Sequence, residues 1–436
     1  MRVSPGSKAV SGYQCARWLR ATFVGTLLLL AAGVAHASCP TGAYRSDGGD
    51  FVVIAAGPSE EPSTQRYLFR DGRRGKVGDE GGPASCADEI AVIHGVPWPR
   101  VPTTERLTTF PSDGAKLRGK LIEPARGGRR PLVVMVHGSE RTSAVATSIY
   151  PYVLVAQGIS VFVYDKRGTG GSEGEYTQNF ELLGDDAAAA LATARTMAAG
   201  HFNRAGFFGG SQGGWVAPLA ATHSGADFVA VGFGLVASPV DEDLEQMLSE
   251  AKAAGYGPDV VANIVALSKA TDTLVASHFS KGFETLEKLR RAHSGQPWVK
   301  TIDGEYSGDM LRTTDADLRR IGQARFDNLE LIWHYDAVAV LRNLKVPLLW
   351  VLAADDREAP IVNTRKVLIK LVGEGRPIDL FLFPKTEHGM YEYETLPDGS
   401  RRATHVTDGY FRLLADWIKD SAAGTYGRGE RLCSER

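Results

Sequence analysis

A serine between glycines is the first residue in this sequence whose type and surroundings could do chemistry. Residues 209–213 read Gly-Gly-Ser-Gln-Gly and match the pattern Gly-x-Ser-x-Gly, in which a serine is exposed on a sharp turn from a strand into a helix. The apolar run 205–208 before Ser211 and the helical run 215–220 after it provide that context. Once a base removes its proton, such a serine can attack an acyl carbon. We therefore predict that Ser211 is a nucleophile.

The same pattern occurs a second time, at residues 170–174 around Ser172. The residues after Ser172 show no helical pattern and lie in a Gly-rich stretch. Because a nucleophile on such a turn needs a helix directly after it, we predict that Ser172 serves the structure of a loop and not catalysis.

In this architecture an acid and then a histidine base follow the serine along the chain. Of the ten histidines, His388 comes directly after the apolar run 378–383, where a loop at the carboxyl edge of a sheet is expected. The acid should come from the loop 353–360, which contains Asp355 and Asp356 side by side. Two adjacent side chains cannot both face one imidazole, and the spacing alone leaves the choice open.

The oxyanion that forms during acyl transfer needs two backbone N–H donors. We predict one at Gln212, directly after the nucleophile, and the other at Ser139, in the loop that follows the apolar run 132–136. His137 at the start of that loop is interpreted as structural. The mechanism needs no cofactor and no metal, and no spacing of cysteine and histidine in the sequence resembles a zinc site.

These residues need a scaffold, and the alternation of apolar runs with helical patterns from residue 104 onward predicts one. It indicates an α/β fold with a mostly parallel central sheet and helices on both faces, preceded by a hairpin of 106–110 with 116–122. The predicted strands are 132–136, 159–164, 205–208, 228–233, 348–352 and 378–383, and the predicted helices lie near 147–157, 179–199, 212–224, 361–372 and 404–419.

Residues 239–335 interrupt the alternation with amphipathic helical patterns and no convincing strand. A segment of this length is too long for a loop, so we predict a helical cap inserted into the α/β domain 104–436. Its acidic residues Glu242, Asp243 and Glu245 could hold a substrate amino group, but a solvated helix face is the simpler and favoured explanation.

The N-terminal part has two predicted sections. Residues 1–37 combine basic residues, an apolar stretch and Ala35-His36-Ala37, which predicts a cleaved signal peptide and export to the periplasm or the extracellular space. Residues 38–103 indicate a small β-rich module that ends in a Pro-rich linker at 96–102. Because export leads to an oxidising compartment, Cys39 and Cys86 are predicted to form a disulfide, which leaves Cys433 unpaired.

Composition excludes several classes of protein. The 49 Lys and Arg residues nearly balance the 51 Asp and Glu residues, so the net charge of −2 gives no reason to expect nucleic acid or an anionic membrane as a partner. No run of apolar residues is long enough for a polytopic membrane protein. The expected partner is a small-molecule substrate, and the oligomeric state is left open.

The motifs together resemble the α/β-hydrolase superfamily. The similarity covers residues 104–436 outside the cap, and residues 211–215, Ser-Gln-Gly-Gly-Trp, are similar to its dienelactone-hydrolase-like and serine-aminopeptidase-like branches. The resemblance implies that the acid lies four residues before Pro360, which is Asp356, and that 165–170 is a structural turn. One departure is the loop after Gly138, where relatives often carry more glycine or proline.

The resemblance and the residues lead to the same expected function. We expect a secreted or periplasmic serine hydrolase that cleaves carboxylic esters through Ser211, His388 and Asp356. The alternatives are a peptidase or amidase on the same triad, with a short peptide as substrate, and a binding protein without catalysis on a hydrolase scaffold.

Overall fold

The computed structural model describes residues 38–57, 61, 63–87 and 89–432. The predicted signal peptide at 1–37 and Cys433 lie outside the described residues. Within the described residues, no helix is long and apolar enough to cross a membrane. Their contacts place them in one compact unit.

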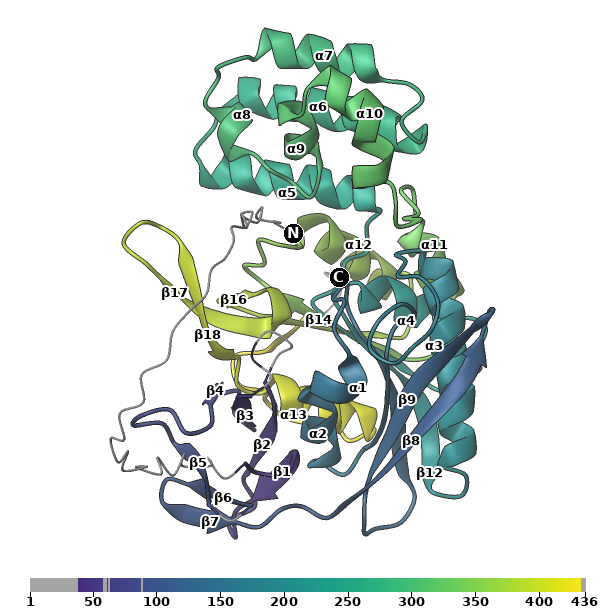
Figure 1. The fold of residues 1–436 in the computed structure, drawn as a ribbon, viewed down its shortest axis with the longest axis vertical. Helices are drawn as coiled ribbons and strands as arrows, with labels where there is room; N and C mark the ends of the chain where they lie inside the picture. Colours follow the sequence, from purple (N-terminus) through teal and green to yellow (C-terminus); the bar gives the residue numbers. More distant parts are fainter. Residues whose placement is uncertain (1–37, 58–60, 62, 88, 433–436) are drawn as a thin grey trace, which may run out of the picture. The chain divides into compact units, whose positions relative to one another are not determined.

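A nine-stranded mixed sheet lies at the centre of the described chain (Figure 1). Its six central strands, from β15 to β11, run parallel, and β19, β9 and β8 are antiparallel to their neighbours. In spatial order the strands are β19 (Glu430–Leu432), β15 (Ile378–Phe383), β14 (Leu348–Ala353), β13 (Val229–Gly232), β12 (Phe202–Gly210), β10 (Arg130–Val136), β11 (Ser160–Tyr164), β9 (Ala115–Pro124) and β8 (Thr103–Ser112).

The parallel strands are buried on both faces, which explains their continuous apolar sequences. In β14, Leu348, Trp350 and Leu352 belong to the hydrophobic core on one face of the sheet. Leu349 and Val351, which alternate with them, belong to the core on the other face. The predicted strands and the hairpin β8–β9 are therefore confirmed, with shifts of a few residues at their ends.

Helices cover both faces of the sheet. Helices α3, α4, α11 and α12 contribute to the first core and α2 and α13 to the second. The helices of this α/β architecture are α1 (Ala144–Thr147), α2 (Tyr150–Val155), α3 (Phe180–Met197), α4 (Gly213–Ala221), α11 (Ala337–Asn343), α12 (Val362–Gly373) and α13 (Tyr410–Ile418).

Two small antiparallel sheets precede the central one. Strand β2 is buried on both faces, because Phe51 and Val53 join the core under the central sheet while Val52 and Ile54 join a separate core. The strands are β1 (Gly42–Arg45), β2 (Phe51–Ala56), β3 (Gln65–Phe69) and β4 (Arg74–Lys76) in one sheet, and β5 (Ala84–Ala87), β6 (Ile90–Ile93) and β7 (Val96–Trp98) in the other.

The predicted linker at 96–102 is wrong in its first half. Residues Val96–Trp98 form β7, which pairs with β6. Pro97 is tolerated in this strand because β7 lies at the edge of the three-stranded sheet, where a missing N–H breaks no ladder.

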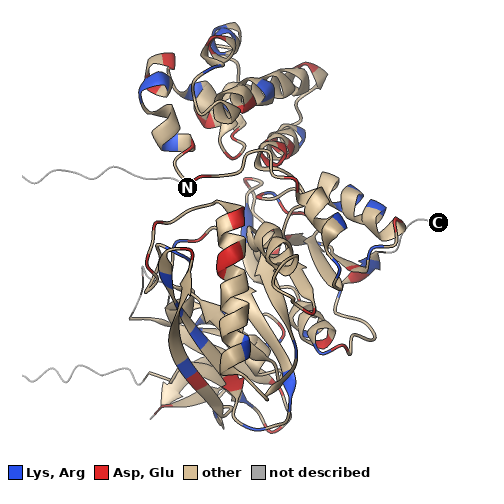
Figure 2. Cartoon of the chain, turned by 90° about the vertical axis from the view of Figure 1, so that its right-hand side faces the viewer, with Lys and Arg blue, Asp and Glu red and all other residues tan. Residues whose placement is uncertain are grey.

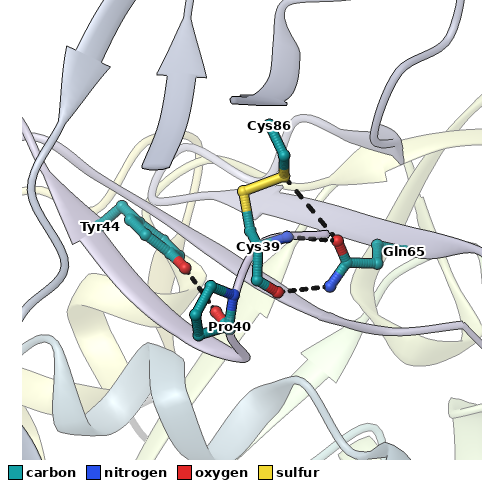
Figure 3. The surroundings of a disulfide bond; sticks show 5 residues. All are labelled: Cys39, Pro40, Tyr44, Gln65 and Cys86. Atoms are coloured by element: carbon teal, nitrogen blue, oxygen red, sulfur yellow. Dashed lines mark hydrogen bonds between the residues drawn. A yellow bond between two sulfur atoms is a disulfide. The ribbon is translucent and has the colours of Figure 1, made fainter. Parts of the chain in front are cut away.

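The predicted disulfide between Cys39 and Cys86 is confirmed (Figure 3). Their Cα atoms are 5.5 Å apart. The Gln65 side chain fixes the chain beside the bond, because its Oε1 accepts a hydrogen bond from the Cys39 N–H at 2.8 Å and its Nε2 donates one to the Cys39 carbonyl at 2.6 Å. The disulfide thus ties the first described residues to β5.

Six helices with a core of their own lie between β13 and β14 in the sequence. Glu245 connects this helical segment to the α/β part, because its Oε1 accepts a hydrogen bond from the Asn363 N–H at 3.0 Å, at the start of α12. The helices are α5 (Pro239–Ala253), α6 (Pro258–Ala276), α7 (Phe283–Ala292), α8 (Trp298–Thr301), α9 (Ser307–Arg312) and α10 (Asp315–Phe326).

The predicted helix at 404–419 is wrong at its start. Residues Arg401–Val406 form strand β18, which pairs with β17 (Tyr391–Thr395) after the short β16 (Thr386–Glu387) and the 3₁₀ turn His388–Met390. Helix α13 begins only after Gly409, whose φ of 89° ends the extended chain.

Acidic and basic residues are both spread over the helices and the sheet (Figure 2). This agrees with the near-zero net charge.

Candidate active site

Ser211 occupies a strained turn between β12 and α4. Its φ of 52° lies in the left-handed region, which is unfavourable for a residue with a side chain and typical of functional positions. A Cβ at Gly209 would lie 2.4 Å from the carbonyl oxygen of Gly213. The strand and the helix therefore approach so closely that the turn needs glycine on both sides of the serine.

The loop after β10 lies against this turn. A Cβ at Gly138 would lie 3.4 Å from the Ser211 Cβ, so the two backbones are close neighbours. The backbone N–H groups of Ser139 and Gln212 make no hydrogen bond to any described residue, and both are therefore available as donors. Gln212 is buried, while Ser139 is exposed.

His388 and Asp356 are brought together by the loops after β15 and β14. The Asp356 Oδ2 accepts a hydrogen bond from Nδ1 of His388 at 2.9 Å. The Asp356 Oδ1 accepts backbone N–H bonds from Glu358 at 3.1 Å and Ala359 at 2.8 Å. The carboxylate is thus held in place by its own loop and leaves one oxygen for the imidazole.

Asp355, the neighbouring acid, faces another partner. Its Oδ2 accepts a hydrogen bond from the Tyr393 hydroxyl at 2.8 Å, and its carbonyl oxygen accepts one from the Arg401 guanidinium at 2.9 Å. Asp355 therefore joins its loop to the β17–β18 hairpin and makes no hydrogen bond to His388.

Phe233 connects the serine turn to His388. A Cβ at Gly210 would lie 2.5 Å from the Phe233 ring, and the centroids of the Phe233 and His388 rings are 5.1 Å apart in an edge-to-face arrangement. Ser211, Phe233 and His388 thus lie along one edge of the sheet. The Ser211 hydroxyl makes no hydrogen bond to a described residue, as is common for such pairs without substrate.

The charge on His388 is set by its carboxylate neighbours. Burial alone would lower the pKa of the imidazole, but the hydrogen bond and charge of Asp356, with smaller contributions from Glu358 and Glu305, raise that pKa above its ordinary value of 6.5. Glu358 lies 3.7 Å from the second ring nitrogen. The same environment stabilises an imidazolium whenever the ring accepts a proton.

Other histidine–carboxylate pairs lack this setting. His278 lies 2.6 Å from Asp327 and His334 lies 2.9 Å from Asp272, but their side chains are 71% and 59% exposed, against 17% for His388. Both pairs involve the helical segment and its exit, not a loop at the strand ends.

Ser172 has the structural surroundings predicted from its sequence context. Its hydroxyl donates a hydrogen bond to the Asp165 carbonyl at 2.6 Å and accepts one from the Arg118 N–H at 2.9 Å. The buried Asp165 carboxylate in turn accepts the Gly171 N–H at 2.9 Å. These bonds hold the 165–170 turn together.

The three acidic residues of α5 have different surroundings. Asp243 is fully buried and accepts the N–H groups of Tyr306 and Ser307, and Glu245 is bonded to α12. Glu242 is only partly buried, and its pKa is raised by burial and then by Glu305, Asp243, Asp356 and Glu358. Only Glu242 therefore lies near the His388 loop without a structural partner of its own.

Sequence reasoning missed Lys166 and Tyr176 as parts of this site. Lys166 is buried and its ammonium donates a hydrogen bond to Oε1 of Gln212 at 2.8 Å. The Tyr176 hydroxyl donates one to the Ser139 carbonyl at 2.6 Å. The available signal was a lysine two residues after the apolar run that ends at Tyr164, where a charge is rarely buried without a partner. Among the described residues, no group of histidine, cysteine and carboxylate side chains is arranged to hold a metal.

Comparison with known proteins gives a family match over part of the chain and a related protein. A family model described as serine aminopeptidase, S33, matches residues 127–294, which include Ser211 but neither Asp356 nor His388. The quorum-quenching protein AidA of Acinetobacter baumannii (strain MDR-ZJ06) is 24% identical over 270 residues, which cover 61% of this chain and 83% of that protein.

Two solved structures contain chains that are similar to this one. The acylaminoacyl peptidase of Pyrococcus horikoshii covers 81% of this chain at 14% identity with a TM-score of 0.41, and this chain spans only 46% of its length. The esterase Pf2001 of Pyrococcus furiosus covers 66% of this chain, and 84% of its own, at 14% identity with a TM-score of 0.40. The strand order and the serine turn are similar to those of the α/β-hydrolase superfamily, and the family match over residues 127–294 supports the same superfamily.

Proposed function

We propose that this protein is a serine hydrolase that cleaves carboxylic esters through an acyl-enzyme on Ser211. The observation that carries the proposal is the hydrogen bond between Asp356 and His388, formed at the same sheet edge as the strained turn at Ser211. A strained serine, a buried carboxylate and a histidine from three separate strand ends suit acyl transfer and no obvious structural task.

The proposed mechanism assigns one task to each group. His388 accepts the Ser211 proton through Nε2 while Asp356 keeps the proton on Nδ1, so that the ring has the tautomer a base needs. Ser211 attacks the acyl carbon, and the N–H groups of Gln212 and Ser139 hold the resulting oxyanion. The imidazolium then gives its proton to the leaving alcohol, and water releases the acid in a second round.

The helical segment 239–335 is proposed to act as a cap that selects substrates. It follows β13, whose carboxyl end borders the serine turn through Phe233. A cap over this edge would contribute binding energy to the acyl or alcohol group and would leave the chemistry to the loops below.

The test is hydrolysis of a graded series of p-nitrophenyl esters by the wild type and by Ser211→Ala. The proposal expects ester hydrolysis that Ser211→Ala abolishes. Because the relative AidA is named a quorum-quenching protein, quorum-sensing signals belong in the same panel. A binding protein on this scaffold would show no Ser211-dependent turnover with any of these compounds, which would overturn the proposal.

A second candidate function is a peptidase or amidase on the same residues. The partly buried Glu242 favours it. Burial and then several neighbouring carboxylates raise the pKa of Glu242, and a substrate ammonium would relieve the repulsion among these carboxylates. The family model for a serine aminopeptidase points the same way.

Aminoacyl p-nitroanilides with a free or an acetylated amino group distinguish the two functions. A peptidase of this kind would cleave the free form faster, and Glu242→Gln would remove that preference. The matched control is Glu181→Gln, an exposed carboxylate on α3. If acetylation makes no difference and esters are cleaved faster, the ester hydrolase is the better description.

Export to the periplasm or the extracellular space is also proposed. The disulfide between Cys39 and Cys86 supports it, because such bonds persist in oxidising compartments. Intact-mass analysis of protein recovered outside the cytoplasm should give a chain that starts at Ser38. Recovery of the chain only in the cytoplasm would contradict the proposal.

A further inference from the structure

The Lys166 side chain links the two loops that carry the proposed oxyanion donors. Lys166 follows β11 and is only 2% exposed. Its ammonium donates hydrogen bonds to the Gly138 carbonyl oxygen, in the loop after β10, and to Oε1 of Gln212, directly after the serine turn. A buried charge is costly unless it is paired and hydrogen-bonded, so this lysine is held between the two loops by strong, charge-assisted bonds.

The bond to Gly138 fixes the direction of the next N–H group. The carbonyl of Gly138 and the N–H of Ser139 belong to one planar, trans peptide unit and point in opposite directions. When Lys166 holds the carbonyl on its side, the Ser139 N–H points away from the lysine. That N–H makes no hydrogen bond to a described residue, and the adjoining Gly138 lies against Ser211.

Tyr176 supports the same peptide from a second side. Its hydroxyl donates a hydrogen bond to the Ser139 carbonyl at 2.6 Å, and its ring centroid lies 5.2 Å from the Lys166 ammonium. The Arg141 guanidinium lies 4.0 Å from the centroid of the same ring. The carbonyls of Gly138 and Ser139 are thus both anchored by side-chain hydrogen bonds.

We infer that Lys166 is a positioning residue for the oxyanion site: its ammonium fixes the Gly138 carbonyl and the Gln212 side chain and thereby aims the Ser139 N–H at the oxygen of the reacting acyl group. The inference rests on the proposed function, because it concerns the same reaction. The Lys166 charge also polarises the Gly138–Ser139 peptide unit and favours the negative charge that develops on the substrate oxygen.

The charged groups around Lys166 determine the pH range in which its side chain is charged and can position the oxyanion site. Burial lowers the pKa of Lys166, the Glu140 carboxylate opposes this effect and Arg141 adds to it, and the result is a pKa of about 8. Burial and the Lys166 charge lower the pKa of His137 to about 3, so this histidine is neutral. Lys166 is therefore charged near neutral pH and loses its charge as the pH rises through about 8, which predicts an alkaline loss of kcat.

The test compares Lys166→Met, Lys166→Arg and the control Lys120→Met. Lys120 is a partly buried lysine that bonds the Tyr152 hydroxyl at 3.2 Å and has no contact with the serine turn. With p-nitrophenyl esters, Lys166→Met should lower kcat roughly 30- to 1000-fold with KM changed less than about threefold, as expected for loss of an oriented oxyanion donor. Affinity for a trifluoromethyl ketone, whose adduct with Ser211 carries an oxyanion, should fall in parallel, and Lys120→Met should change neither.

Lys166→Arg keeps a charge at all accessible pH values and should retain more activity than Lys166→Met. In this variant kcat should no longer fall at alkaline pH. This second variant keeps the inference testable if Lys166→Met does not fold. The inference is overturned if folded Lys166→Met keeps kcat within about threefold of the wild type, or if Lys166→Arg and the wild type have the same alkaline profile. Failure of the proposed function is a different result, since the wild type would then show no hydrolysis that Ser211→Ala removes.

Discussion

The Asp356 carboxylate accepts a hydrogen bond from Nδ1 of His388 at 2.9 Å, whereas the adjacent Asp355 carboxylate accepts one from the Tyr393 hydroxyl at 2.8 Å. Two acids that are neighbours in the chain thus have separate partners on separate elements. Of the two, only Asp356 is placed to orient the imidazole. This agrees with the family resemblance, which places the acid four residues before Pro360.

Asp356→Asn should leave the fold intact and reduce kcat by about 10⁴, because an amide favours the wrong tautomer of His388. Asp355→Asn should change kcat far less, since its carboxylate bonds Tyr393. Steady-state kinetics of both variants, with circular dichroism as a check on folding, measure the difference. If Asp355→Asn is the more damaging change, the acid has been assigned to the wrong residue.

The pH dependence of kcat/KM should report the raised pKa of His388. The ring must be neutral to act as a base, so activity falls as the pH drops through that pKa, and the midpoint of the acid limb should lie above 6.5. Glu358→Gln removes one of the carboxylates that raise the pKa and should move the limb to lower pH. The shift should be below about 0.5 pH unit, because the Glu358 side chain is 69% exposed and screened by solvent.

Glu181→Gln, which changes an exposed carboxylate of α3, serves as the control for net charge. A limb that moves equally in both variants would show that Glu358 has no specific effect on His388.

Loss of the disulfide should destabilise the protein without changing the chemistry. Cys39 and Cys86 are 47 residues apart in the sequence, and closing a loop of this length is worth about 4 kcal/mol in the chain-entropy model. Urea unfolding of Cys39→Ser with Cys86→Ser should show a loss of this order while kcat is retained below the transition. A double variant as stable as the wild type would contradict the prediction.

Replacing residues 239–335 by a short linker should alter substrate preference more than catalytic power. If this segment is a cap, its removal should broaden or shift the preferred ester chain length, while Ser211 still reacts with an active-site probe. The exposed core must remain soluble, which gel filtration checks. An unchanged chain-length profile in a folded variant would mean that the segment does not select substrates.

The central elements could be predicted because each has a strong local signal. Strands buried on both faces must be apolar throughout, as in 348–353, and the turn at Ser211 needs glycine because the backbones touch. The same reasoning failed for β18, whose polar, half-exposed residues pair only with the equally polar β17. A two-stranded hairpin on the surface lacks the hydrophobic periodicity that marks a core strand.

Within the site, the sequence could indicate which residue types lie at which strand ends, but not the contacts between loops. Lys166 was noticed only as part of a turn, because its two acceptors belong to loops that follow different strands. Such long-range hydrogen bonds depend on the order of strands in the sheet, where β10 lies between β11 and β12, and not on local spacing.

The most direct test of the account is labelling with a fluorophosphonate probe and mapping of the adduct by mass spectrometry. The account predicts a single adduct on Ser211, loss of labelling in Ser211→Ala, and loss of about 10⁴–10⁶ in kcat in the same variant. Ser172→Ala should keep its labelling and most of its activity, with a stability loss of about 1–3 kcal/mol from the unpaired Arg118 N–H. An adduct on Ser172, or folded Ser211→Ala that still hydrolyses esters at the wild-type rate, would contradict it.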